Sequence, residues 1–397
     1  MNINKMKAID KWLGIPLCVF LTIFNKVWIF RKSAKRNNAV KKILVMKYFG
    51  IGSILLATPA LRALRKGYPE AKITFLTFSG NQEICNLLKV ADDYIYLSTT
   101  DFSAFFFQTL KTLYRIRKEH FDISIDMEFF SKFSTIMNYL TGAQRRIGFF
   151  SRQMWRGNLL TDHIYYNQHR HIVDIFLALV AVLGINTKDK EVERIKTSDE
   201  EKKYIREFLK SEGVGEKDLL IGVNVNASDM CYERKWPGES FAKLISRLIT
   251  SHDAKVVLIG GKEDKGYVEK LVEGIDFKEK ILNLAGRLNL TQLLAFLSEV
   301  KFFITNDSGP LHLAVSLGIP TVSFFGPETP SLYGPPIDDG NNLVFYKNLY
   351  CSPCLSVYNV KTAVCNGDNQ CLKQISFEEV YKAIEEKYFS HEYDRLP

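Results

Sequence analysis

The stretch TNDSGPLHLAVSLGIPTVSFFG, residues 305–326, places short polar residues between two apolar segments. The preceding Phe302, Phe303 and Ile304 are typical of a parallel strand buried on both faces. Leu311–Leu317 has the spacing of a helix. The polar residues are therefore predicted to form the turn between that strand and that helix. Such a turn lies at the carboxyl end of a strand, where ligands bind, and the first N–H groups of the helix lack intrahelical partners. This arrangement suits an anion.

Strands and helices alternate on both sides of this turn, which predicts an α/β domain in the second half of the chain. Ser376 and Glu379 have the spacing of a capping box and predict a final helix. The predicted strands are Leu219–Val225, Lys255–Ile259, Phe302–Thr305 and Thr321–Phe325, and the predicted helices are Glu239–Thr250, Lys265–Val272 and Leu290–Ser298.

The first half opens with a predicted βαβ unit. Its strands are Ile43–Met46 and Ile73–Phe78, and they flank a glycine-containing turn and a helix, Ser53–Lys66, with Pro59 inside it. A dinucleotide fingerprint would need a third glycine at position 55, which is Leu55. The sequence therefore lacks the usual motif for hydride chemistry.

Two carboxylates, Asp126 and Glu128, follow another predicted strand that starts near residue 121. A helix comes next, and Arg145, Arg146 and Gly148 follow it. Acids at a strand end lie at the ligand edge of such a domain. The alternative interpretation is that one of them caps the next helix.

The composition fits a globular protein of two domains with appendages, since 397 residues are 46% hydrophobic and 24% charged. The net charge of +9 is concentrated at the start of the chain. Residues 1–42 hold ten Lys or Arg and a single acid, Asp10, whereas the rest holds 43 basic and 43 acidic residues. A neutral body argues against a nucleic-acid partner.

The segment WLGIPLCVFLTIFNKVWIF, residues 12–30, is apolar but interrupted by Asn25 and Lys26. RKSAKR follows it, so no signal-peptide cleavage site is present. We expect an interfacial membrane anchor, with a helix packed on the body and a transmembrane span as alternatives. As a separable anchor, residues 1–38 are expected to be dispensable for the rest of the protein.

Four cysteines form a C-x2-C-x10-C-x5-C cluster near the C-terminus: Cys351, Cys354, Cys365 and Cys371. Four thiolates can hold zinc, but the second pair lacks the usual short spacing. We favour a loop of reduced cysteines over a metal site.

The sequence resembles glycosyltransferase family 9, the ADP-heptose:lipopolysaccharide heptosyltransferase family. Four motifs carry the resemblance in order, over about residues 43–385: GIGSILLATPALRALR, ERKWP, LIGGKED and TNDSGPLHLAVSLGIPTVSFFGP. The resemblance implies an α/β protein of the GT-B fold, with two Rossmann-like domains facing a cleft. The expected divisions are a basic hydrophobic anchor at 1–42, an acceptor domain at 43–195, a nucleotide-sugar domain at 196–375, and a C-terminal helix and tail at 376–397.

The resemblance further implies an inverting transferase that moves a sugar, expected to be heptose from ADP-heptose, to a lipopolysaccharide core or related cell-surface glycan. No cofactor is expected beyond the nucleotide-sugar substrate. The expected partners are this donor, a lipid-linked glycan acceptor and an anionic membrane surface. The expected location is the cytoplasmic face of the inner membrane, peripheral or monotopic. Two alternatives remain: a membrane-tethered nucleotide-sugar binding protein, and a GT-B nucleotide-sugar epimerase.

The residues suit a diphosphate donor because helix N-terminal N–H groups and cationic side chains neutralise phosphate. Asp307 is expected to contact the sugar or fix the loop, and Glu263 or Asp264 to contact the ribose, with helix capping as the alternative. The candidate donor-binding residues are Asn224, Arg234, Lys235, Glu263, Asp264, Asp307, Ser308, Gly309, Leu311 and His312.

The turn at Gly50 and Gly52, expected to lie on the acceptor side, departs from the family pattern. The best-known members have Gly-Asp there, and that Asp is taken as the catalytic base, whereas Ser53 follows Gly52 in this chain. A serine is no base at neutral pH without help. The candidate catalytic residues are therefore Glu128, Asp126 and Ser53, with Glu128 favoured as the base.

Overall fold

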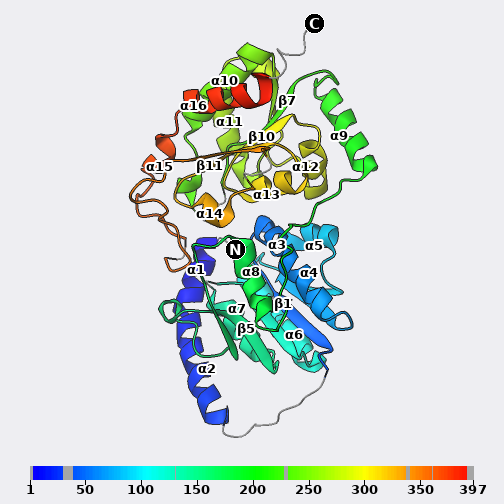
Figure 1. Ribbon diagram of the computed structural model, residues 1–397, viewed down its shortest axis with the longest axis vertical. Helices are drawn as coiled ribbons and strands as arrows, with labels where there is room; N and C mark the ends of the chain where they lie inside the picture. Colours follow the sequence, from blue (N-terminus) through cyan, green and yellow to red (C-terminus); the bar gives the residue numbers. More distant parts are fainter. Residues whose placement is uncertain are drawn as a thin grey trace. The chain divides into compact units, whose positions relative to one another are not determined.

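The computed structural model describes residues 3–29, 39–129, 131–227, 231–336, 340–359 and 361–390 (Figure 1). The chain divides into two compact units. The first comprises Met1–Glu193 and Val357–Val360, and the second comprises Arg194–Ser356 and Lys361–Pro397.

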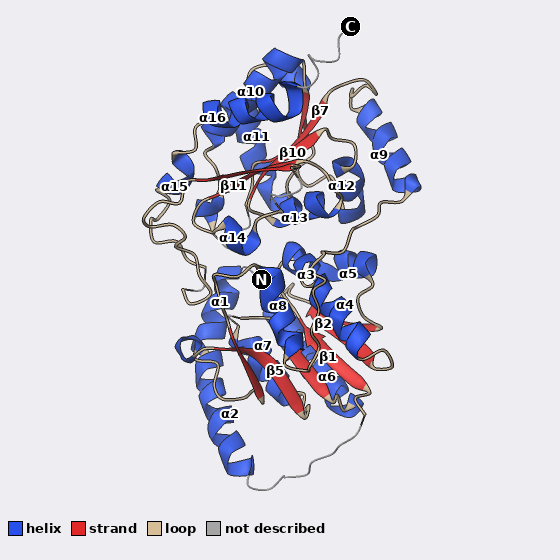
Figure 2. Ribbon diagram, in the orientation of Figure 1, coloured by secondary structure: helices blue, strands red, loops and turns tan. Residues whose placement is uncertain are grey.

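The first unit is built on a six-stranded parallel sheet in the order β3-β2-β1-β4-β5-β6. Strands are red in Figure 2, where β1, β2 and β5 of this sheet are labelled. β1 pairs with β2 on one side and β4 on the other, so the strand order reverses between β1 and β4. Ligand sites of open α/β sheets lie at such a reversal. The strands are β1 Lys42–Met46, β2 Lys72–Phe78, β3 Asp93–Leu97, β4 Ile123–Asp126, β5 Arg145–Phe150 and β6 Asp162–Tyr165.

Helices connect these strands: α3 Ile51–Leu56, α4 Thr58–Gly67, α5 Gln82–Leu88, α6 Phe102–Glu119, α7 Lys132–Leu140 and α8 Ile172–Ala181. The single helix predicted over Ser53–Lys66 is wrong, because α3 ends at Leu56 and α4 starts at Thr58. Pro59 lies in the first turn of α4, where a residue without an N–H group is tolerated.

The second unit repeats the architecture, with a parallel sheet in the order β12-β11-β10-β7-β8-β9. Here the strand order reverses between β7 and β10. The strands are β7 Leu220–Asn224, β8 Lys255–Leu258, β9 Ile281–Asn283, β10 Phe302–Asn306, β11 Thr321–Phe325 and β12 Asn342–Tyr346. The α-helices are α9 Asp199–Ser211, α10 Gly238–His252, α11 Lys265–Glu273, α12 Leu290–Leu297, α13 Gly309–Ser316, α14 Pro330–Tyr333, α15 Gln370–Lys373 and α16 Phe377–Ile384.

An aromatic core fixes the loop before α10 to this second sheet. The ring of Trp236 stacks on Phe324 with centroids 4.2 Å apart, and its indole N–H donates to the carbonyl of Ile375 at 2.9 Å. Trp236 is fully buried. The segment that carries Arg234 is therefore anchored to the strand next to the predicted anion-binding turn.

The N-terminal arm forms two helices, α1 Ile3–Trp12 and α2 Gly14–Ile29, and α2 packs against α7 of the first unit (Figure 1). Gly14, Cys18 and Leu21 form a buried stripe along α2, since positions three and four apart share one helix face. Cys18 and Leu21 belong to one hydrophobic cluster with Ile136 and Leu159.

Asp10 binds the arm to α7 through its carboxylate. It accepts hydrogen bonds from the backbone N–H groups of Lys132 and Phe133, at 2.9 and 2.8 Å, and from the hydroxyl of Ser131 at 3.0 Å. An acidic side chain at a helix N-terminus satisfies free N–H groups and complements the helix dipole. The expectation of a separable anchor is therefore wrong, because deletion of the arm would remove this cap and expose apolar residues of the cluster.

The outward face of the arm stays apolar. Residues 5–27, which run through α1 and α2, are together long and apolar enough to cross a membrane, and little of this stretch is buried. The exposed large apolar side chains are Trp12, Leu13, Leu17, Val19, Phe20, Ile23, Phe24 and Val27. The arm therefore has two faces: one packs on the protein, and the other is exposed. The basic residues 31–36 lie outside the described residues.

We expect Asp10→Ala to lower the free energy of unfolding by about 1 to 2 kcal/mol, because two backbone N–H groups of α7 lose their acceptor. Chemical denaturation monitored by circular dichroism measures this loss. Asp10→Asn, which keeps an acceptor oxygen, should lose less than half as much. Equal stability of Asp10→Ala and the native chain would show that the cap contributes nothing.

Candidate active site

The turn between β10 and α13 is held by the side chain of Asn224 at the end of β7. Its amide group donates to the hydroxyls of Thr305 and Ser308, at 3.1 and 3.0 Å. Ser308 is the N-cap residue of α13, but its hydroxyl makes no capping hydrogen bond. The first turn of α13 therefore keeps N–H donors that the N-cap does not satisfy, as an anion site requires.

Asn306 ties the turn to two other segments. Its amide group donates to the carbonyls of Val225 and Asn226, at 3.1 and 3.2 Å, and its side-chain oxygen accepts from the N–H of Trp236 at 2.8 Å. These contacts of Asn306 were not predicted from the sequence, although Asn306 lies inside the polar turn predicted between the strand and the helix. Asn224 and Asn306 together fix the strand ends at the point where the strand order reverses.

The guanidinium of Arg234 reaches this turn and pairs with Asp307. Two of its nitrogens lie 3.1 and 3.0 Å from the same carboxylate oxygen, and it also donates to the carbonyl of Asp307. Burial lowers the pKa of Arg234, but Asp307 and Glu328 together raise it above its ordinary value. Asp307 therefore holds the loop, one of the two expected roles, and keeps a permanent cation beside the start of α13.

Lys235 does not join Arg234. Its ammonium lies over the rings of Tyr267 and Tyr232, 4.5 and 5.4 Å from their centroids. The sequence suggested a cationic pair at the leaving phosphate. The structure gives the two side chains different partners, because a 3₁₀ turn ends at Arg234 and the backbone is extended at Lys235, just before the buried Trp236.

The remaining candidates of this unit have mixed roles. Asp264 accepts from the N–H of Gly261 at 2.8 Å and so closes the turn after β8, which matches the capping alternative. Glu263 is exposed on the same turn, and His312 is half-buried in α13. The N–H of Leu311 donates to the carbonyl of Ser308 at 3.2 Å, so it is already engaged.

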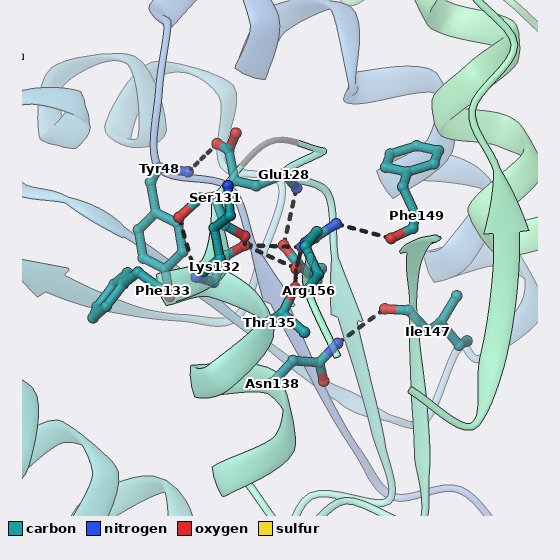
Figure 3. A network of polar contacts seen from close by, with 12 residues as sticks. Tyr48, Glu128, Ser131, Lys132, Phe133, Thr135, Asn138, Ile147, Phe149 and Arg156 are labelled. Atoms are coloured by element: carbon teal, nitrogen blue, oxygen red, sulfur yellow. Dashed lines mark hydrogen bonds and ion pairs between the residues drawn. The ribbon is translucent and has the colours of Figure 1, made fainter. Parts of the chain in front are cut away.

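In the first unit, Glu128 lies where β1 and β4 end (Figure 3). One carboxylate oxygen accepts from the ammonium of Lys47 at 2.7 Å and from the backbone N–H groups of Tyr48 and Phe49, at 2.8 and 2.9 Å. The other oxygen is buried without a hydrogen-bond partner among the described residues. A buried acceptor without a partner is costly, so it marks a position that a ligand can satisfy.

Both carboxylate oxygens of Asp126 are engaged by the protein. One oxygen accepts from the N–H of Glu128 at 2.9 Å, and the other accepts from the hydroxyl of Ser134 at 2.8 Å and from the guanidinium of Arg156. Burial raises the pKa of Asp126 to about 6, although Arg156 opposes the rise. Asp126 therefore supports Glu128 and α7, whereas Glu128 keeps one oxygen that no group among the described residues engages.

The glycine turn of the acceptor side precedes α3. Gly50 has a φ of +84°, a conformation that side chains rarely adopt, and Gly52 is buried. Ser53 is half-buried in the first turn of α3. Glu128 bonds to the backbone at Tyr48 and Phe49, so it fixes the chain just before this turn. Lys47 and Arg156, which organise the two acids, were missed from the sequence.

All seven cysteines are free thiols in the structure. Burial raises the pKa of Cys371 to about 11, and the nearby thiols of Cys354, Cys365 and Cys351 add to the rise. Among the described residues, no group of three or more His, Cys, Asp or Glu side chains is arranged to hold a metal ion.

Two Rossmann-like units, each with polar groups gathered where its strand order reverses, define a glycosyltransferase of the GT-B fold. A sequence model of Glycosyltransferase family 9 (heptosyltransferase) matches residues 109–364, more than half of the chain. The chain belongs to this family and is a glycosyltransferase of the heptosyltransferase type, which confirms the resemblance seen in the sequence.

Individual relatives agree with this assignment. The chain is 24% identical to the lipopolysaccharide core heptosyltransferase OpsX of Haemophilus influenzae over 78% of this chain and 85% of the relative. A crystal structure of a family 9 glycosyltransferase from Veillonella parvula is similar with a TM-score of 0.72 and 26% identity, over 90% of this chain and 99% of that one. The E. coli ADP-heptose lps heptosyltransferase II has a TM-score of 0.70 and 20% identity, over 88% and 99%.

Proposed function

We propose that this enzyme transfers heptose from ADP-heptose to the core of a lipopolysaccharide or a related lipid-linked glycan, with inversion at the anomeric carbon. The observation that carries the proposal is the N-terminus of α13, which lacks a side-chain cap and stands beside the cation of Arg234. The names of the relatives support the donor and the acceptor, because they include a lipopolysaccharide core heptosyltransferase and an ADP-heptose enzyme.

The donor diphosphate would bind at the start of α13, where the N–H groups of Ser308 and Gly309 and the helix dipole face it. As the bond between the sugar and the phosphate breaks, negative charge grows on the ADP leaving group. Preformed N–H donors and Arg234 stabilise that charge, and these groups need no metal cofactor to do so. Glu263, which is exposed on the turn after β8, is available to the ribose hydroxyls.

The acceptor hydroxyl attacks the anomeric carbon and loses its proton to a base, for which we propose Glu128. Its free oxygen is the atom that accepts the proton, while Lys47 and two backbone N–H groups hold the other oxygen in place. Ser53 is assigned a contact with the acceptor instead of proton transfer, because a serine hydroxyl needs a base of its own.

The exposed apolar face of α2 is proposed to lie in the headgroup region of the cytoplasmic face of the inner membrane. Side chains such as Phe20 and Ile23 would enter the lipid, while Lys5, Lys11 and Lys26, all exposed, would meet anionic headgroups. The opposite face is occupied by α7, so the helix lies on the membrane surface and does not span it. An amphiphilic acceptor is concentrated in the same plane.

Titration calorimetry should show ADP-heptose binding more tightly than UDP-glucose or GDP-mannose. Arg234→Gln should weaken ADP-heptose binding by about 10- to 100-fold, because a hydrogen bond to a charged group is lost. The matched control is Arg206→Gln, since Arg206 is 63% exposed and pairs with Glu299 at the surface. A preference for a UDP- or GDP-sugar would refute the proposed donor.

Glu128→Gln should lower kcat by about 100- to 10,000-fold, the usual contribution of a general base, and change the affinity for ADP-heptose by no more than a few-fold. Gln keeps an acceptor for the N–H groups of Tyr48 and Phe49, and Glu207→Gln at an exposed position of α9 is the control. Retained turnover would rule out Glu128 as the base. Native protein that binds the donor but never transfers it would favour the binding-protein alternative, and sugar isomerisation without an acceptor would favour the epimerase.

Substitution of Phe20 and Ile23 by Glu should reduce binding of the full-length protein to vesicles of phosphatidylglycerol and phosphatidylethanolamine by about 100-fold or more, because two apolar side chains leave the lipid. Both side chains are about 60% exposed, so the fold should tolerate the change. Tyr204→Glu, on the exposed surface of α9, is the control. Co-sedimentation that is unaffected by the double substitution would contradict the proposed membrane face.

A further inference from the structure

A second ion pair lies near the anion-binding turn and has no role in the mechanism above. Glu328 follows the end of β11, and its carboxylate pairs with the ammonium of Lys361 from the loop that carries the cysteines. The side chains of both residues are less than 10% exposed. The ammonium of Lys361 also lies over the ring of Tyr333, 4.9 Å from its centroid.

One oxygen of Glu328 is unused. The other oxygen binds Lys361, while this one is buried without a hydrogen-bond partner among the described residues. Burial raises the pKa of Glu328, and the charges of Asp307 and Arg234 act on it as well, so these groups are neighbours. The described structure therefore places an unsatisfied acceptor next to the start of α13. If the ion pair only held the loop, hydrogen bonds to both carboxylate oxygens would make the fold more stable.

The strand order indicates which part of the donor would lie beside Glu328. The order β8-β7-β10-β11 places the turn of Glu263 on one side of α13 and Glu328 on the other. Three strand spacings amount to about 14 Å, the scale of an extended nucleotide sugar. With the ribose at β8 and the diphosphate at the β10 turn, the sugar must point toward β11, because it is attached to the far phosphate.

We propose that Glu328 and Lys361 recognise the hydroxyl groups of the donor sugar. This inference rests on the proposed function, since it assumes that the diphosphate binds at α13. The free oxygen of Glu328 accepts a hydrogen bond from a sugar hydroxyl, and Lys361 donates to a neighbouring one. A carboxylate beside an ammonium matches a pair of adjacent hydroxyls, each of which both donates and accepts. The pair thus determines specificity for the sugar and takes no part in proton transfer.

The test compares binding of ADP-heptose and of ADP alone to the full-length protein by calorimetry. Glu328→Gln and Lys361→Met should each weaken ADP-heptose by about 10- to 100-fold and leave ADP within about two-fold, because ADP has no sugar to lose contact with. Glu328→Asp keeps the negative charge beside Lys361 but withdraws the free oxygen. It should weaken ADP-heptose with little change in the thermal midpoint.

The control is Glu379→Gln, which removes the carboxylate of a half-exposed pair with Lys347 in the same unit and should leave both affinities unchanged. Equal loss of ADP and ADP-heptose in the Glu328 variants would show that the pair only supports the loop, and unchanged affinities would also overturn the proposal. If native protein binds another nucleotide sugar in place of ADP-heptose, the donor assignment fails. The same comparison with that sugar and its nucleotide diphosphate then decides the role of the pair.

Discussion

The candidate sites in both units depend on one constraint of a parallel sheet: a polar group at the end of a buried strand must find its hydrogen-bond partners inside the protein. In the second unit the amides of Asn224 and Asn306 meet this demand, because one amide can donate to two acceptors at once. The bond from Asn224 engages the hydroxyl of Ser308, and this hydroxyl makes no capping hydrogen bond to α13. The anion site is thus a consequence of how neighbouring strand ends are satisfied.

In the first unit, the polar groups at the strand ends find their partners in buried ion pairs. Lys47 and Arg156 neutralise Glu128 and Asp126, and both pairs are buried. Buried ion pairs stabilise a fold weakly at best, because both charges must be desolvated. Their place at the reversal between β1 and β4 suits a role in positioning the carboxylates. A rigid carboxylate with one oxygen fixed and one free is better placed for chemistry than a solvated one.

The sequence predicted the central elements because their signals are local. Apolar runs identified β1, β2, β7, β8, β10 and β11, and the polar turn before α13 was located from its own residues. The strands β3, β5, β6, β9 and β12 were missed. They are short, lie at or next to the sheet edges, and have many half-buried positions and no long apolar run. The N-terminal segment was expected to leave the body, but one apolar face of α2 packs against α7 and the other apolar face is exposed.

The supporting residues could not be found from the sequence, because their partners are distant along the chain. Lys47 and Glu128 are separated by 81 positions, and Arg156 and Asp126 by 30. No pattern in a single sequence reports such a pairing. The roles of Lys47, Arg156 and Lys361 required the fold, whereas the candidates in the turn before α13 required only the spacing of polar and apolar residues.

During synthesis of the chain, the arm is made long before the helix on which it packs. Asp10 binds residues that follow it by more than 120 positions, so α2 leaves the ribosome well before α7 exists. At 5 to 20 residues per second this interval lasts roughly 6 to 24 s. During that time the face of α2 that later packs against α7 is exposed as well as the outward face. A nascent chain in this state is suited to capture by a chaperone or by the lipid surface, and the first unit would then complete its fold around a helix that is already held there.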